Sequence, residues 1–198
     1  MRLAFFAALL LSLSPITAAA QDRAGAGNDE QALSALFDAD QAIRKAIDPS
    51  KPVDITLVRR MIAEDAERRT TTRALLAQGR VKTADDFYHA AFILQHGTKP
   101  ADYLLAHSLA LAAAARGKTE AQWISAATLD RYLMAIGQPQ IYGTQYVRDA
   151  RAGAAAGLTM DPYDRTLVPD TLRTALGVPT LAEQQARLAK DSPAGARN

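Results

Sequence analysis

The stretch Gly137-Gln138-Pro139-Gln140-Ile141-Tyr142-Gly143-Thr144-Gln145-Tyr146 lies where an apolar helical pattern stops and amide, hydroxyl and phenol groups gather. Gly137 suits the left-handed residue that ends a helix, and Pro139, which lacks an N–H, prevents the helix from resuming at once. Gly143 permits a tight turn or a close approach to a ligand. The side chains of this stretch offer many hydrogen bonds and carry no full charge. We therefore expect a loop suited to recognition rather than to a reaction.

Helical patterns lie on both sides of this loop. Apolar residues recur at helical spacing, and residues such as Asp54 and Thr83 stand where a helix start needs a cap. The predicted helices span residues 30–47, 55–78, 84–96, 103–115, 120–136, 170–175 and 181–190. The sequence thus predicts an all-α fold, a single-domain helical bundle of about five long helices plus one or two short C-terminal helices.

The N-terminus has the pattern of a signal peptide. Arg2 precedes an apolar core from Leu3 to Leu13, and small residues precede Gln21. We expect residues 1–20 to be removed by cleavage near Ala20, which places the protein in the periplasm or outside the cell. Residues 21–29 are predicted to be a flexible leader, 30–190 the helical domain, and 191–198 a disordered tail.

Composition excludes several classes of protein. The chain has no cysteine, which rules out disulfides and a lipoprotein anchor. Removing Arg2 with the signal peptide lowers the formal net charge from +2 to +1, and the basic residues alternate with acidic ones. This pattern argues against a nucleic-acid partner. No apolar stretch is long enough for stable membrane association. The sequence leaves the oligomeric state open.

Charged residues on the first two predicted helices are, in the simplest interpretation, exposed to solvent. Asp40 and Arg44 are one helical turn apart with the acid first, and Gln41 lies beside them. Taken alone, such a pair is usually an exposed ion pair worth a few tenths of a kcal/mol. The charged run from Glu64 to Arg73 is likewise predicted to be a solvated face.

The third predicted helix carries two histidines. His89 and His96 are seven residues apart, whereas metal-binding histidines on a helix are usually four apart. We therefore predict neither a metal site nor a cofactor. Packing between helices is the simplest role for His89, and we predict a structural role for His107 also. His96 follows Gln95 at the helix end and stays a candidate for a functional residue.

Taken together, these stretches of sequence resemble a bacterial domain-of-unknown-function family of small helical proteins. The resemblance covers about residues 33–183, and its most specific part is the Gly-Gln-Pro-Gln-x-Tyr-Gly-Thr-Gln block. It implies that one pocket gathers ten residues, which are Asp40, Gln41, Arg44, Gln95, His96, Asp130, Arg131, Tyr142, Thr144 and Gln145. The family usually has an acid two positions after its Gln-His pair, where this chain has Gly97-Thr98. Separately, the predicted helices 103–115 and 120–136 resemble one tetratricopeptide-like hairpin.

Three functions fit these observations. The first is binding of a small polar molecule or peptide, such as a cell-wall fragment, with Arg44 or Arg131 holding a carboxylate. The second is a hydrolase-like enzyme with His96 as general acid/base, oriented by Asp40 or Asp130. The third is an adaptor that offers a groove to a partner protein. The uncharged, amide-rich loop favours binding.

Overall fold

A computed structural model describes residues 16–48, 50–148 and 158–191 of the chain. In this part the secondary structure consists almost entirely of helices, and the all-α prediction is confirmed. The helices are α1 (Ile16–Lys45), α2 (Ile55–Ala77), α3 (Ala84–Leu94), α4 (Pro100–Ala115), α5 (Ala121–Ala135), α6 (Asp170–Ala175) and α7 (Leu181–Asp191). Two short strands, β1 (Val147–Arg148) and β2 (Leu158–Thr159), lie between α5 and α6.

Caps and stop residues place most helices within a few residues of the predicted positions. The Asp54 carboxylate accepts hydrogen bonds from the backbone of Thr56 and Leu57 at the start of α2. Thr83 and Asp86 form a capping box at the start of α3. Gly137 follows α5 with a φ of 76°, in the left-handed region that a residue with a Cβ rarely adopts.

Helix α1 begins earlier than predicted. It includes residues 21–29, for which the sequence predicted a flexible leader. Glycines suggested flexibility there, but alanines alternate with them, and extending an existing helix costs far less than starting one. Residues 1–15 and 192–198 lie outside the described residues, so the signal peptide and most of the predicted tail stay predictions.

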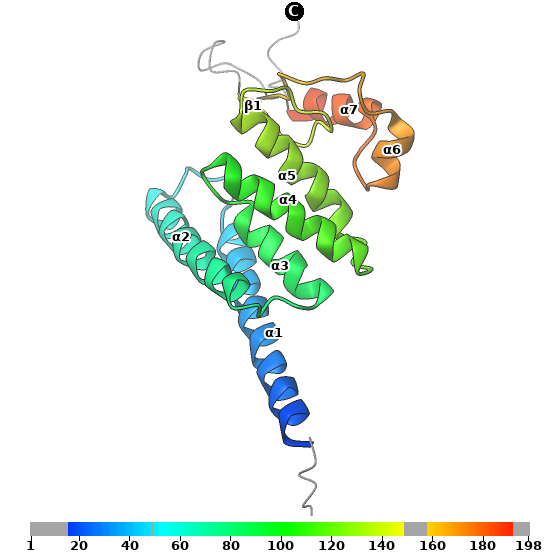
Figure 1. Ribbon diagram of the computed structural model, residues 1–198. Coiled ribbons are helices and arrows are strands. Elements are labelled where there is room, and N and C mark those ends of the chain that lie inside the picture. The colour runs from blue at the N-terminus through cyan, green and yellow to red at the C-terminus, as the bar shows by residue number, and fades with distance from the viewer. Residues whose placement is uncertain (1–15, 49, 149–157, 192–198) are drawn as a thin grey trace, which may run out of the picture.

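The long helices pack mainly as successive neighbours. Helix α3 packs against α1, α2 and α4, and α4 packs against α5 as an antiparallel hairpin. Figure 1 shows the first turns of α1 extending beyond this bundle, while α6 and α7 lie at the opposite end, beside α5. Within the described residues, no helix combines the length and the apolar character needed to cross a membrane.

The core is built from large aliphatic residues and many alanines. Leu33, Leu75, Leu94, Leu109 and Ile124 are its large members, each at most 5% exposed. Buried alanines on α3, α4 and α5 let these helices approach closely, since interhelical distance depends on the side chains at the contact. Helices α4 and α5 therefore supply much of the core.

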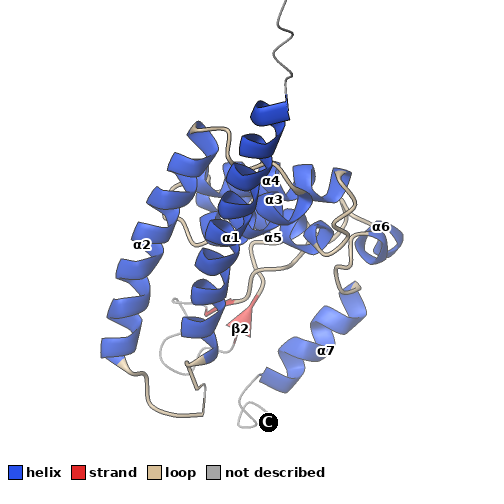
Figure 2. Cartoon of the chain, turned by 90° about the horizontal axis from the view of Figure 1, so that it is seen from below, coloured by secondary structure: helices blue, strands red, loops and turns tan. Residues whose placement is uncertain are grey.

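A small C-terminal unit folds back on the end of α5. Strands β1 and β2 pair antiparallel, with Val147 opposite Thr159 and Arg148 opposite Leu158. Gln140 forms an isolated parallel bridge with Tyr163. Figure 2 shows β2 and α7 on the same side of the molecule. This unit anchors both ends of the Gly137–Tyr146 loop. Backbone hydrogen bonds join Gln140 to Pro162 and Asp164, and β1, which follows the loop directly, pairs with β2.

Candidate functional site

The predicted site residues lie in two groups, and Arg131 lies between them. The first group is a network of charged side chains on α1, α2 and the end of α3. Asp40, only 1% exposed, accepts hydrogen bonds from Gln41 at 2.9 Å and from Arg44 at 2.7 Å. Arg44 also donates to Asp65 at 2.8 Å, which ties α1 to α2. The exposed ion pair expected for Asp40 and Arg44 is therefore corrected to a partly buried one, with Asp40 on the buried side.

Helix α2 supplies members of this network that the sequence did not predict. Arg68 is buried and donates to Asp65 at 3.0 Å and to Glu64 at 3.1 Å. The solvated face predicted for this part of α2 is thus wrong for Asp65, Arg68 and Thr72, which are buried. Their spacing of three and four residues is the signal that could have revealed them, since it places them on one face of a helix.

His96 lies at the edge of the same network. Its Nε2 is 3.7 Å from Asp40 Oδ2, longer than a hydrogen bond, and its backbone carbonyl accepts from Arg69 at 2.7 Å. Burial lowers the pKa of His96 to about 3, and the positive charge of Arg44 adds to this effect. Burial also raises the pKa of Asp40, against the lowering effect of Arg44. The imidazole is therefore neutral at physiological pH, without a hydrogen bond to an orienting carboxylate.

Gln95 and the other two histidines lie apart from this network in their contacts. Gln95 is buried at the C-cap of α3, and its backbone N–H donates to Ala91. His89 stacks on Phe37 with ring centroids 4.5 Å apart. His107 Nδ1 is 2.9 Å from the Ser125 carbonyl oxygen. Among the described residues, no group of His, Asp and Glu side chains is arranged to hold a metal ion.

Asp130 organises the second group. Its carboxylate is fully buried and accepts hydrogen bonds from the backbone N–H groups of Ile141, Tyr142 and Thr144 at 2.8, 3.0 and 2.9 Å. The Thr144 hydroxyl donates to it as well, at 2.7 Å. A carboxylate with this many donors holds the loop in one conformation. Asp130 and the Thr144 hydroxyl thus hold the loop, since they bond to each other and Asp130 also bonds to the loop backbone.

The loop is also held from its other side. Arg173, fully buried on α6, donates to the carbonyl oxygens of Tyr142 at 2.6 Å and Ile141 at 3.1 Å. The Gln184 amide on α7 donates to the Tyr142 carbonyl at 2.7 Å. Gln140 donates to the backbone carbonyls of Gln145 and Met160. Sequence reasoning missed Arg173 and Gln184, because nothing in their local pattern indicates a partner so far away along the chain.

Arg131 and Gln145 meet in a pocket between α4, the end of α5 and the start of β1. The pocket has a volume of about 310 Å³ and is lined by Tyr103, Arg131, Met134, Ala135, Gln145 and Val147. Its volume is at the lower end of the range for small-molecule sites. The Nε of Arg131 is buried and has no hydrogen-bond partner. Within the described part of the chain, its guanidinium forms no ion pair either. Burial lowers the pKa of Arg131, with Tyr103 opposing and Arg44 adding to the shift.

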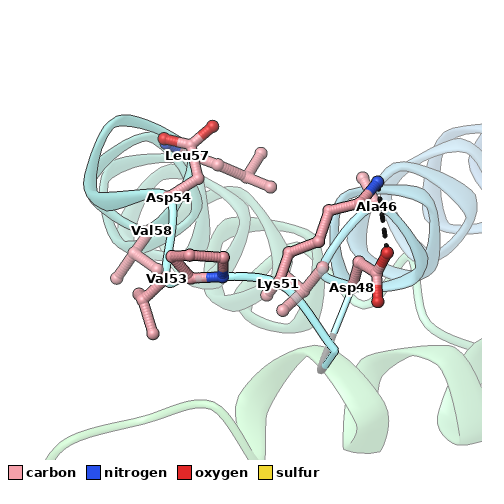
Figure 3. A pocket seen from close by; sticks show the side chains of 9 residues that line it. Ala46, Asp48, Lys51, Val53, Asp54, Leu57 and Val58 are labelled. Atoms are coloured by element: carbon pink, nitrogen blue, oxygen red, sulfur yellow. Dashed lines mark hydrogen bonds and ion pairs between the residues drawn. The ribbon is translucent and has the colours of Figure 1, made fainter.

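A second hollow lies at the turn between α1 and α2. It has a volume of about 270 Å³, and its lining is mainly apolar, with Ile47, Pro52, Val53, Leu57 and Val58 among its residues. Figure 3 shows the Lys51–Asp48 ion pair at its edge, and this pair is solvent-exposed. None of the buried polar atoms that lack a partner in the described residues belongs to this lining. We therefore place the candidate site at Arg131, where such an atom is present.

Comparison of the chain with family models, with curated proteins and with solved structures finds no match. The resemblance to a bacterial domain family stays a prediction, and the candidate site is argued from its geometry.

Proposed function

We propose that this protein binds a small polar ligand through an anionic group, and that Arg131 holds this group. The observation that carries the proposal is the half-buried Arg131, whose Nε is buried without a hydrogen-bond partner, at the wall of a pocket. An arginine stays charged at physiological pH, and a half-buried charge without a counter-ion carries a desolvation cost. A bound carboxylate removes this cost and accepts hydrogen bonds from the guanidinium in a planar, bidentate arrangement.

Arg131 is favoured over Arg44 because of their partners. Arg44 forms ion pairs with Asp40 at 2.7 Å and Asp65 at 2.8 Å, so its charge is compensated inside the protein. Arg131 has an uncompensated charge, and Arg44 is near enough to influence its pKa. The hydrolase alternative gains no support from His96, whose nearest carboxylate oxygen is 3.7 Å away.

The test is a calorimetric titration with isocaproate and its uncharged amide, isocaproamide. Isocaproate is expected to bind, and Arg131→Gln is expected to weaken binding about 10- to 100-fold, because hydrogen bonds to a charged group contribute about 1.5–3 kcal/mol. Isocaproamide is expected to bind the wild type as weakly as isocaproate binds the variant. Arg59→Gln, on the exposed side of α2, is the matched control and leaves binding unchanged. Equal binding of the acid and the amide would refute the proposal.

A further inference from the structure

The two neutral polar side chains of the Arg131 pocket can accept hydrogen bonds but have no free donor. The Gln145 Nε2 donates to the Ala127 carbonyl at 3.3 Å and to the Thr144 hydroxyl at 2.9 Å, which occupies both of its hydrogens. The Ala127 carbonyl fixes this amide orientation, since the flipped amide would place two oxygens together. The Tyr103 hydroxyl donates its only hydrogen to the Gly97 carbonyl at 2.8 Å. Gln145 Oε1 and Tyr103 Oη therefore remain as acceptors.

The charge of the pocket matches a ligand with a single negative charge. Arg131 contributes one positive charge, and the charge of Arg44 is balanced by Asp40 and Asp65. His96 is neutral, because burial lowers its pKa to about 3. Met134 and Ala135 belong to the last turn of α5, where helix carbonyls disfavour additional negative charge. A carboxylate fits this environment better than a doubly charged phosphate.

The rest of the lining is apolar. Met134, Ala135 and Val147 offer aliphatic surface, and Tyr103 offers the face or edge of its ring. Burying an aliphatic side chain of the ligand here contributes about 25 cal/mol for each Å² removed from water. The complementary ligand thus has one carboxylate, one hydrogen-bond donor close to it, and one apolar group.

We propose that the pocket binds an N-acylated amino acid unit, the group found at the C-terminus of a peptide. Its carboxylate pairs with Arg131, its amide N–H donates to Gln145 Oε1, and its apolar side chain packs on Met134 and Val147. A free amino acid fits less well, because its ammonium group would lie beside the charge of Arg131. This inference rests on the proposed function and specifies its ligand.

The experiment compares four carboxylate ligands, and inorganic phosphate as a fifth, by calorimetry with the wild-type protein. N-acetyl-leucine is expected to bind about threefold to tenfold more tightly than isocaproate, since it adds one neutral hydrogen bond. Leucine is expected to bind at least about tenfold more weakly than N-acetyl-leucine, because its ammonium is repelled. The tripeptide Ala-Ala-Leu tests the source of the unit. Tighter binding than N-acetyl-leucine indicates a peptide terminus, and weaker binding indicates a small acylated amino acid.

The variant Gln145→Met tests the assigned acceptor. It is expected to weaken the binding of N-acetyl-leucine more than that of isocaproate, so that the preference for N-acetyl-leucine is lost, while its thermal unfolding reports whether the loop is intact. The ligand series on wild type tests the inference even where this variant does not fold. The inference is overturned if isocaproate or leucine binds as tightly as N-acetyl-leucine, or if inorganic phosphate binds more tightly than N-acetyl-leucine. In that case, binding of isocaproate that depends on Arg131 still supports the proposed function. Absence of binding by every carboxylate overturns both.

Discussion

Replacing Asp130 with alanine should destabilise the whole C-terminal unit. The carboxylate is fully buried and accepts three backbone N–H groups and one hydroxyl from the loop. The substitution leaves these donors without an acceptor, and a buried donor without a partner costs about 1–3 kcal/mol. Since the donors are only half-buried, we take the lower value for each, which gives a loss of about 3–4 kcal/mol in the free energy of unfolding.

This loss can be measured by thermal unfolding followed by circular dichroism. For a domain of this size, each kcal/mol lowers Tm by about 2–4 °C, so Asp130→Ala should lower it by about 6–16 °C. Asp54→Ala is the matched control, because Asp54 also accepts backbone N–H groups, at the start of α2, but is exposed. Its loss should be about 1 kcal/mol. Equal losses for the two variants would show that Asp130 does not hold the loop as described.

Two further predictions concern the loop and the charged network. Gly143→Ala should lower the free energy of unfolding by about 2–4 kcal/mol, and the control Gly79→Ala by only about 1–2 kcal/mol. Both glycines have φ near +70°, but of the two only Gly143 has a neighbour, the Tyr163 ring, 2.7 Å from an added Cβ. Equal losses in urea unfolding would contradict this. Because the pKa of His96 is lowered to about 3 in the folded state, His96 takes up a proton between pH 6.5 and pH 4.5 only in the unfolded state. The free energy of unfolding should therefore decrease by about 2–3 kcal/mol as the pH is lowered from 6.5 to 4.5. His96→Gln should remove this part of the fall, and an unchanged pH dependence of the unfolding free energy would show that His96 is not buried as a neutral group.

The helices were predictable because their determinants are local. Asp54, Thr83 and Gly137 act on residues a turn away, so the start of α2, the start of α3 and the end of α5 follow from short-range chemistry. The pair of two-residue strands was not predicted, since strands this short show no alternating pattern. The early start of α1 was missed because glycines were given more weight than the alanines between them.

The candidate site was predictable only in part. The sequence indicated that Gly137–Tyr146 is rich in hydrogen-bonding groups, but not that Asp130 and Arg173 hold the backbone of this loop. Those partners are far along the chain or on another element, and their pairing depends on the tertiary fold. Similarly, sequence alone left Arg44 and Arg131 as equal candidates for holding a carboxylate. Only the three-dimensional contacts show which arginine has its charge compensated.

The most direct test of the account is nitrogen-15 NMR of the Arg131 Nε–H group during titration with isocaproate, with the signal assigned by its loss in Arg131→Gln. A carboxylate that pairs with the guanidinium should shift this signal, and the shift should saturate at the dissociation constant that calorimetry gives. If isocaproate binds while the Arg131 signal does not move, the ligand occupies another site, and the central claim that Arg131 holds the anion is wrong.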